Sequence, residues 1–463
     1  MKNIFFIRTA MATIAISTMM LPGCQNQTQQ VKEPPKADTV LTHVDWSKSA
    51  NIYEVNLRQH TMEGTIKAFQ ADLPRLKAMG VDILWLMPIF PIGKENRKGS
   101  MGSYYAVADY TKVNPEFGTL ADIKSLVDEA HHLGMFVILD WVANHSAWDH
   151  PWAKNHPEWY KHDSTGAFVS PFDWTDVIAF DYENPELRDS MISALKFWIR
   201  EADVDGFRCD VAGLVPVDFW NEARKQLQAI KPVFMLAEDE ETIPLLESAF
   251  DMNYSWKFHH ILNQIAQGKK HASELWEFIE WNKKNYPTNA YRMLFITNHD
   301  ENSWNGTVGE RMGDAGDAMA VLTYTFPGMP LIYSGQEAGL DKRLRFFEKD
   351  TIDWRNIKKE AFYTTLNHLK HNNKALWNGK EGGEIIALTD RKDTTMLAFL
   401  RENEDNKVVV VMNLSNLPQK FSLDPNSPSG MFSNAFTGET IDLSENQLFD
   451  LTPWGYLVFV SKE

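Results

Sequence analysis

An arginine and an aspartate lie two residues apart at the end of the apolar run 204–210, as Arg208 and Asp210. In a β-strand, residues i and i+2 point to the same side, so both side chains would meet at the end of the strand. A guanidinium beside a carboxylate favours the ionised carboxylate and lowers its pKa, and a carboxylate nucleophile requires an ionised, fixed group. Because structural ion pairs have the same signature, the pair alone leaves both interpretations open.

Three other apolar runs also end in polar side chains. These are Asp140, Asn144 and His145 after residues 135–139, Glu238 after residues 233–237, and Asn298, His299 and Asp300 after residues 293–297. If the runs are parallel strands, the carboxylates of Asp210, Glu238 and Asp300 converge on one pocket. A carboxylate that attacks and a carboxylic acid that protonates the leaving oxygen are the equipment for cleaving a glycosidic bond.

Eight short apolar runs alternate with helical patterns and predict the elements that position these groups. The runs are residues 51–55, 81–88, 135–140, 204–210, 233–238, 249–252, 293–298 and 330–334. Among the helical patterns, residues 65–79 end at Gly80, and residues 119–133 begin with a possible capping box of Thr119 and Asp122. This alternation predicts an α/β fold, a (β/α)8 TIM barrel, with its chemistry at the carboxyl ends of the strands.

The pattern predicts two further parts of the chain. Residues 146–182, after the third strand, are rich in Trp, His, Asp and Pro without a long helical period, which indicates an insertion in the barrel of residues 46–374. After residue 374, short apolar runs are separated by Asn, Gly and Pro. Residues 375–463 are therefore expected to form a C-terminal antiparallel β-sandwich.

The N-terminus has the features of an export signal. Residues 1–23 carry Lys2 and Arg8 before an apolar stretch that is too short to span a membrane, and Cys24 follows. This end resembles the lipobox of bacterial lipoproteins, which implies cleavage before Cys24, lipidation of its thiol, and residues 24–45 as a tether. An ordinary signal with an incidental cysteine is the alternative. We expect a secreted lipoprotein anchored to the cell envelope, at the bacterial outer membrane.

Charge and composition narrow the partners. The formal net charge of −16 argues against nucleic acid or anionic lipid as a ligand, and the 16 Trp, 13 Tyr and 27 Phe residues offer rings that could stack on sugars. The only cysteine besides Cys24 is Cys209, so no intramolecular disulfide is expected in the mature protein. We expect no organic cofactor and a monomer.

The strand-end motifs resemble the four signature regions of the α-amylase family, glycoside hydrolase family 13. They are residues 140–145, residues 206–210, Glu238 and residues 295–300, in the order of the family and at its approximate spacing. Residues 105–110 resemble the segment after the family's second strand. The resemblance runs from about Trp46 to the C-terminus.

The resemblance implies a role for each matched residue. Asp210 would be the nucleophile, Glu238 the general acid and then base, and Asp300 the group that grips the hydroxyls of the distorted sugar. The implied substrate-binding residues are Tyr105, which would stack beneath the sugar, His145 and His299, which would hydrogen-bond it, Arg208, which would orient Asp210, and Asn298. Asp140 is expected to support Arg208 and the floor of the pocket rather than to touch the substrate.

The chain departs from the family where a structural calcium is usually held. Many members have a Lys-His pair after the nucleophile, and Leu214 stands in place of that histidine here. Asn144 and Asp176, or Asp173, could still bind Ca²⁺ through their oxygens. We therefore treat Ca²⁺ as an open expectation with Asn144 and Asp176 as its ligands.

These observations together predict a retaining α-glucan hydrolase that cleaves α-1,4-glucosidic bonds of starch, glycogen or maltooligosaccharides. The nearer alternatives use the same site: a cyclomaltodextrinase or neopullulanase, an α-1,6-glucosidase, or a transglycosylase. The more distant one is a glycan-binding lipoprotein or transporter subunit without catalysis, which the presence of all three carboxylates disfavours.

Overall fold

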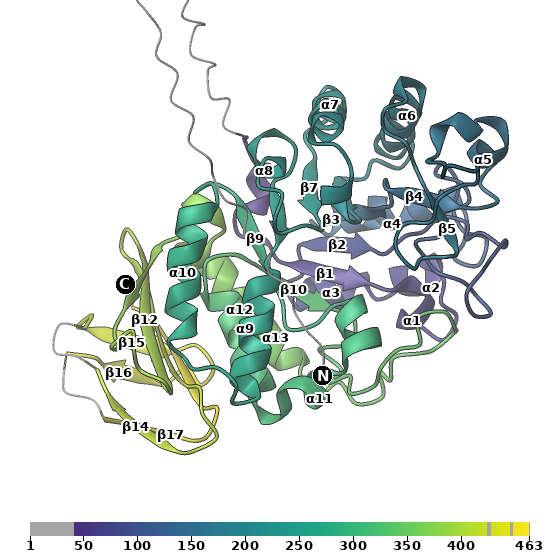
Figure 1. The fold of residues 1–463 in the computed structure, drawn as a ribbon. Coiled ribbons are helices and arrows are strands. Elements are labelled where there is room, and N and C mark those ends of the chain that lie inside the picture. The colour runs from purple at the N-terminus through teal and green to yellow at the C-terminus, as the bar shows by residue number, and fades with distance from the viewer. Residues whose placement is uncertain (1–40, 424–426, 445–447, 463) are drawn as a thin grey trace, which may run out of the picture. The chain divides into compact units, whose positions relative to one another are not determined.

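Eight parallel strands close into a barrel in the computed structural model, which describes residues 41–423, 427–444 and 448–462 (Figure 1). The barrel strands are β1 (Ile52–Val55), β2 (Ile83–Leu86), β3 (Phe136–Trp141), β6 (Gly206–Cys209), β7 (Phe234–Ala237), β8 (Met252–Tyr254), β9 (Tyr291–Leu294) and β10 (Met329–Tyr333). Each pairs with its neighbour in parallel, and β10 closes the barrel on β1, with Leu331 opposite Ile52. The (β/α)8 prediction is confirmed.

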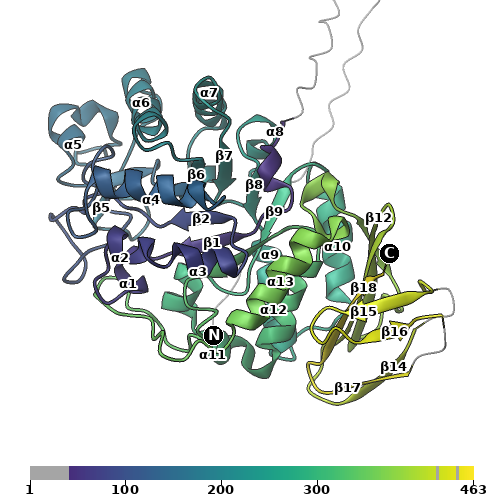
Figure 2. The ribbon, with the colours of Figure 1, turned by 180° about the vertical axis from the view of Figure 1, so that it is seen from behind.

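Helices follow the strands along the chain and lie outside the barrel (Figure 2). They are α1 (Leu57–His60), α2 (Ile66–Gln70), α3 (Leu73–Ala78), α4 (Leu120–His132), α6 (Pro185–Ala202), α7 (Val217–Gln228), α8 (Leu245–Ser248), α9 (Trp256–Ala266), α10 (Glu274–Asn285), α11 (Val308–Met312), α12 (Gly316–Thr325) and α13 (Glu360–Asn372). The capping box at Thr119 and Asp122 is present. The single helix predicted over residues 65–79 is wrong: it is broken into α2 and α3, because Pro74 cannot donate a hydrogen bond to the preceding turn.

Alternate residues of the strands face the inside of the barrel. Ile52, Ile138 and Phe234 belong to one buried apolar cluster there. Glu54 lies two residues after Ile52, and Asp140 two residues after Ile138, so both side chains also face the inside of the barrel. Polar groups therefore replace apolar ones toward the carboxyl ends of these strands. Gly206 begins β6, where a Cβ would lie only 1.8 Å from the carbonyl oxygen of Phe234, so this close approach of two strands requires glycine.

The segment after β3 forms a small substructure of its own, as predicted. Its strands β4 (His145–Ala147) and β5 (Val177–Ala179) pair antiparallel, and α5 (Pro151–Asn155) lies between them in the chain. In Figure 1 these elements stand at the end of the barrel toward which the strands run. The insertion therefore supplies one wall above the carboxyl ends of the strands.

The C-terminal part is an antiparallel sandwich, as predicted. Its strands are β11 (Glu384–Ala387), β12 (Met396–Asn403), β13 (Asn406–Asn413), β14 (Gln419–Ser422), β15 (Met431–Asn434), β16 (Thr440–Asp442), β17 (Leu448–Leu451) and β18 (Tyr456–Ser461). Six form one sheet, and β14 pairs with β17 in a second. Val409 and Val411 share a buried cluster with Phe449 of β17, whereas Phe399 packs edge-on against Phe326, which follows α12.

The described chain begins beneath the barrel rather than in a free tether. His43 Nδ1 lies 2.8 Å from Asp251 Oδ1, Val44 is buried in the barrel cluster, and Trp46 stacks on Phe136. His43 and Val44, assigned above to the tether, instead pack on the barrel, through the contact of His43 with Asp251 and the burial of Val44. The predicted signal and Cys24 lie outside the described residues. Across those residues, no helix is long and apolar enough to cross a membrane.

Candidate active site

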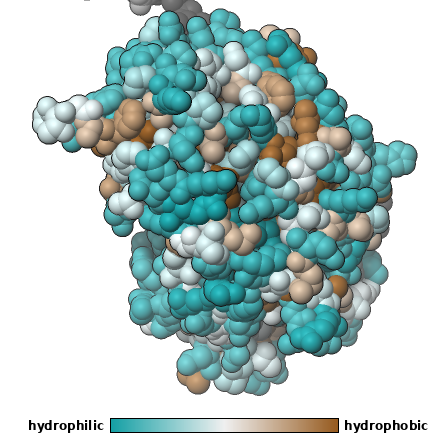
Figure 3. Space-filling model, turned by 90° about the vertical axis from the view of Figure 1, so that its right-hand side faces the viewer, coloured by the Kyte–Doolittle hydropathy of each residue, from teal (hydrophilic) through white to brown (hydrophobic). Residues whose placement is uncertain are grey.

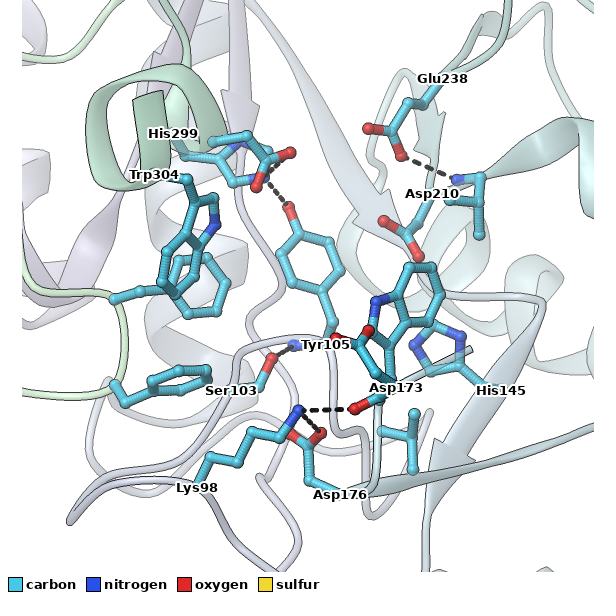
Figure 4. A pocket seen from close by; sticks show the side chains of 16 residues that line it. Lys98, Ser103, Tyr105, His145, Asp173, Asp176, Asp210, Glu238, His299 and Trp304 are labelled. Carbon is cyan, nitrogen blue, oxygen red and sulfur yellow. Dashed lines mark hydrogen bonds and ion pairs between the residues drawn. The ribbon is translucent and has the colours of Figure 1, made fainter. Parts of the chain in front are cut away.

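A cavity of about 400 Å³ opens at the carboxyl ends of the strands, where the three predicted carboxylates meet (Figure 4). Asp210, Glu238 and Asp300 all line it, together with Tyr105, His145 and His299. Figure 3 faces this side of the molecule and shows hydrophobic residues among hydrophilic ones. Most of the polar residues that line the cavity are therefore ones that the sequence analysis named.

Arg208 lies fully buried beneath the cavity and contacts three carboxylates. Its Nη1 donates to Asp140 Oδ1 at 2.8 Å and to Asp210 Oδ1 at 3.1 Å, and its Nη2 forms an ion pair with Glu238 Oε2 at 3.0 Å. Burial alone would lower the pKa of Arg208, but the charges of Asp140 and Glu238 raise it well above its usual value. Arg208 thus holds the carboxyls in place and remains a cation, and Asp140 supports it as predicted.

Asp210 and Glu238 titrate as a coupled pair. Burial and the Glu238 charge raise the pKa of Asp210 well above its usual value, more than Arg208 lowers it. Burial would also raise the pKa of Glu238, but Arg208 and the backbone N–H of Val211, 2.9 Å from Glu238 Oε2, lower it. Arg208 lowers the pKa of Asp210, as the sequence predicted, but burial and the second carboxylate outweigh this effect in the unliganded site. The two carboxyl groups therefore lie in different electrostatic environments, with the pKa of Asp210 raised and that of Glu238 lowered.

His299 connects two walls of the cavity. Its Nδ1 lies 2.5 Å from Glu54 Oε1 on β1, and its Nε2 lies 2.8 Å from the Tyr105 hydroxyl and 3.4 Å from Asp300 Oδ2. The Tyr105 hydroxyl donates onward to Asp140 Oδ2 at 3.1 Å. A continuous polar chain therefore runs across the pocket floor and fixes the orientation of the Tyr105 ring.

His145 is held in its neutral form. Burial lowers its pKa to about 3. Asn144 Nδ2 lies 3.2 Å from His145 Nδ1, which as an acceptor leaves the ring hydrogen on Nε2. Trp174 from the insertion packs edge-on against the ring at 5.4 Å between centroids. His145 can therefore donate a hydrogen bond to a bound hydroxyl without adding charge.

Two predicted substrate-binding residues lie beneath the cavity rather than at its surface. Asn298 is fully buried, and its Oδ1 accepts a hydrogen bond from the N–H of Glu301 at 2.8 Å. Arg208 likewise acts through the carboxyls that it contacts. The strand-end position of Asn298 predicted proximity to the site, but not that its side chain turns back to cap the next turn of chain.

Asp176, one of the two predicted calcium ligands, has a cationic side chain beside it. Asp176 Oδ1 lies 3.1 Å from the ammonium of Lys98, which takes the position of a cation beside this carboxylate. Asn144 places its amide nitrogen 3.2 Å from His145 Nδ1, a contact that does not involve the amide oxygen through which Ca²⁺ would bind, and Leu214 is half exposed. Within the described ranges, the one group of three His, Cys, Asp or Glu side chains with ligand atoms close together is His156, Glu158 and Glu186, which includes neither predicted ligand.

Aromatic side chains that the sequence reasoning missed form part of the cavity wall. Trp304 and Phe346 lie with ring centroids 5.2 Å apart, and Phe346 stacks nearly parallel to Tyr105 at 6.2 Å. Trp304 is 51% exposed. It stands on a single π-helical turn, Glu301–Asn305, directly after Asp300, and such turns are frequent at functional sites. Exposed aromatic faces beside the carboxyls suit the apolar faces of sugar rings.

Fold and site together define a glycoside hydrolase, and comparison with known proteins gives the family. The family described as "Alpha amylase, catalytic domain" matches residues 38–164 and 154–383, and that described as "Maltogenic Amylase, C-terminal domain" matches residues 386–458. The chain belongs to the α-amylase family.

Curated relatives and solved structures agree with this assignment. "Alpha-amylase MalA" of Haloarcula japonica is 29% identical over 82% of this chain, which spans 57% of that protein. A cyclomaltodextrinase from a Bacillus species is 29% identical over 82% of this chain and 70% of its own length. The crystal structure of an α-amylase from Lactobacillus plantarum superposes with a TM-score of 0.81 at 30% identity, over 90% of this chain and all of that one. The structure of the maltogenic α-amylase AmyB from Thermotoga neapolitana superposes with a TM-score of 0.79 at 30% identity, over 90% of this chain and 97% of that one.

Proposed function

We propose that this protein is a retaining α-glucan hydrolase that cleaves α-1,4-glucosidic bonds of starch, glycogen or maltooligosaccharides. The observation that carries the proposal is that Asp210 and Glu238 contact the two terminal nitrogens of one buried guanidinium at the mouth of the barrel. Two carboxyl groups held side by side at a sugar-sized cavity are what a double-displacement glycosidase requires.

In the proposed reaction, Asp210 attacks the anomeric carbon while Glu238 protonates the departing glycosidic oxygen, so that a glycosyl ester forms as the glycosidic bond breaks. Glu238 then removes a proton from water, which attacks the same carbon and releases Asp210. Two inversions retain the configuration. This reaction requires Glu238 to be protonated and Asp210 to be ionised when the substrate is bound, and Arg208, which contacts both, can stabilise the charge on Asp210.

The aromatic wall supports a glucan as the substrate. Tyr105 lies at the cavity floor, and Trp304, Phe346 and Trp174 offer further ring faces or edges. The acid Glu238 must face the leaving group, so the wall at Trp304, which adjoins Asp300, would bind sugars on the non-reducing side of the scissile bond (Figure 4).

A cyclomaltodextrinase- or neopullulanase-type specificity is the second candidate. It is favoured by the match of residues 386–458 to a maltogenic amylase C-terminal domain and by relatives named cyclomaltodextrinase. The two candidate specificities are distinguished by product analysis. The protein is incubated with starch, maltoheptaose, cyclodextrins and pullulan, and the products are followed by chromatography over time. Early mixed maltooligosaccharides from starch support the first candidate, and a marked preference for cyclodextrin or pullulan supports the second.

The mechanism is tested by amide substitutions with a control on the same strand. Asp210→Asn and Glu238→Gln are each expected to lower kcat by at least about 10³-fold with the fold retained, because each removes a group that takes part in bond making. Asp205, at the opposite end of β6, is also buried and bonds His131 Nε2 at 2.8 Å. Asp205→Asn is expected to lower stability and spare kcat.

The stereochemistry of the reaction is a separate test. Proton NMR of the first product should show the α-anomer. Near-normal turnover in Asp210→Asn would contradict the proposal.

We further propose that the enzyme is a secreted, lipid-anchored monomer that works without calcium at Asn144 and Asp176. The signal sequence and Cys24 support the anchor, and the Lys98–Asp176 ion pair supports the second point. Mass spectrometry of the envelope-bound protein should show acyl chains on Cys24. Hydrolysis should survive a chelator, and its loss on chelation with recovery on added Ca²⁺ would contradict the calcium proposal.

A further inference from the structure

A buried glutamate that the reaction above does not use lies directly against a residue of the site. Glu54, on β1, and His299, after β9, have side chains that are 0% and 2% exposed, and Glu54 Oε1 lies 2.5 Å from His299 Nδ1. Glu54 Oε2 is also buried and has no hydrogen-bond partner among the described residues. A lone carboxyl group in an apolar strand is costly to bury. The contact of Glu54 with His299 is therefore the feature that must account for its presence there.

The hydrogen bonds around His299 define its protonation state. The Tyr105 hydroxyl gives its single hydrogen to Asp140 Oδ2, so at 2.8 Å from His299 Nε2 its oxygen is the acceptor. Nε2 therefore carries a hydrogen. Burial raises the pKa of Glu54, and the neighbouring His299 and Arg208 oppose this effect. As a carboxylate, Glu54 accepts from His299 Nδ1, which then carries a hydrogen as well. A ring with both nitrogens protonated is an imidazolium cation.

We propose that Glu54 is a positioning residue of the hydrolase: it keeps His299 as an imidazolium, whose positive charge, 3.4 Å from Asp300 Oδ2, in turn holds Asp300 ionised beside the substrate. This inference rests on the proposed function for the role of Asp300. It concerns a residue that touches neither the substrate nor the reacting atoms, and acts through His299.

The charges around His299 agree with a cation there. Burial lowers the pKa of His299, but Asp300 and Glu54 raise it to about 9, against a lesser opposing effect of Arg208. The titratable groups that face it from the surrounding elements are Glu54 on β1, Tyr105 before α4, Asp140 on β3, Arg208 on β6, Glu238 after β7 and Asp300 after β9. Carboxyl groups outnumber cations in this set, so a second cation beside Arg208 offsets their repulsion.

The effect on Asp300 follows from this arrangement. Burial and the Glu238 charge raise the pKa of Asp300, and His299 at 3.4 Å lowers it. Without the imidazolium, Asp300 would be protonated more readily and would lose its charge-assisted hydrogen bonds to sugar hydroxyls. Such bonds contribute more to binding than neutral ones.

The direct test is the protonation state of His299 in the full chain, read from ring ¹⁵N shifts of histidine-labelled protein without substrate. The His299 signals are assigned by their absence in His299→Gln. In the wild type, both ring nitrogens should stay protonated from pH 5.5 to pH 8. In Glu54→Gln, which keeps the shape of the side chain but removes its charge, His299 should lose a proton within that range. A neutral ring in the wild type at pH 7, or a cation in Glu54→Gln throughout, would overturn the proposal.

A second buried pair provides the matched control. Glu301 Oε2 lies 3.1 Å from His259 Nε2, and neither residue lines the cavity. Glu301→Gln should change the titration of His259 and leave that of His299 as in the wild type. If Glu54→Gln does not fold, the wild-type spectrum still tests the cation, and Glu54→Asp, which withdraws the carboxylate by one methylene, should lower the pKa of His299; an unchanged value would count against the proposal.

The functional consequence is a pH-dependent loss of substrate binding. Between pH 5.5 and pH 8, the KM for maltoheptaose should rise about tenfold in Glu54→Gln relative to the wild type, the size expected for a lost charge-assisted contact. A parallel KM profile in both enzymes would overturn the link to Asp300. Because His299 is titrated in the free protein, a failure of hydrolysis itself leaves that result interpretable.

Discussion

Arg208 and Arg401 are both completely buried, and the two regions that hold them surround them differently. At the carboxyl end of the barrel, Arg208 contacts carboxyl groups of Asp140, Asp210 and Glu238. Between the barrel and the C-terminal sheet, Arg401 of β12 donates instead to the carbonyl oxygens of Thr325, at 2.7 Å, and Gly383, at 3.0 Å. The pKa of Arg208 is raised far above its usual value, whereas burial lowers that of Arg401 to about 9.

The difference shows what each region requires of a buried charge. Carboxyl groups clustered in a cavity repel one another, and Arg208 supplies the cation that offsets this repulsion. Arg401 has no carboxylate partner among the described residues and connects backbone carbonyls that would otherwise be buried without donors. Changes at the first arginine should therefore affect catalysis most, and changes at the second should affect stability most.

The largest expected effect is at Arg208. Arg208→Lys should lower kcat/KM for maltoheptaose by about 10²–10³-fold, because an ammonium cannot reproduce the flat, forked contact with several carboxyls. Steady-state kinetics measure this, and circular dichroism confirms that the barrel persists. A variant with kcat/KM within about threefold of the wild type, a difference below 1 kcal/mol, would break the contrast between the two arginines.

A change at Arg401 should act on stability. Arg401→Met keeps the length of the side chain but leaves the Thr325 and Gly383 carbonyls without donors, at an expected cost of about 2–4 kcal/mol of unfolding free energy. Denaturant unfolding followed by tryptophan fluorescence measures this cost. In the folded variant, kcat/KM should equal that of the wild type, and a selective loss of activity at full stability would contradict the assignment.

The smallest expected effect is on binding at the aromatic wall. Trp304→Ala should raise KM for maltoheptaose about tenfold, since a ring that stacks on a sugar contributes on the order of 1 kcal/mol or slightly more. Its 51% exposure predicts little change in stability. Leu448 of β17 is 62% exposed on the C-terminal sheet and provides the matched control. Leu448→Ala should leave KM unchanged, and equal effects of the two variants would remove the contrast.

Much of the barrel and the position of its strand-end carboxyl groups could be predicted because both follow local rules. Runs of apolar residues that are buried on both faces mark parallel strands, and a polar residue directly after such a run must lie at the carboxyl edge. Asp210, Glu238 and Asp300 were found in this way. The same rule misplaced Asn298, because a strand-end position does not determine how the side chain rotates.

By itself, the sequence determined the order of the strands, the end of the barrel that carries the chemistry, and the carboxyl groups brought to it, since each depends on hydrophobic periodicity along neighbouring residues. Only the tertiary structure decided which charges meet. Glu54 and His299, or Lys98 and Asp176, are far apart in the chain, and their contacts arise when closure of the barrel and docking of the insertion exclude water between them. Burial then sets the pKa values of the site, because the cost of a charge depends on the whole surrounding shell of residues and not on its neighbours in sequence.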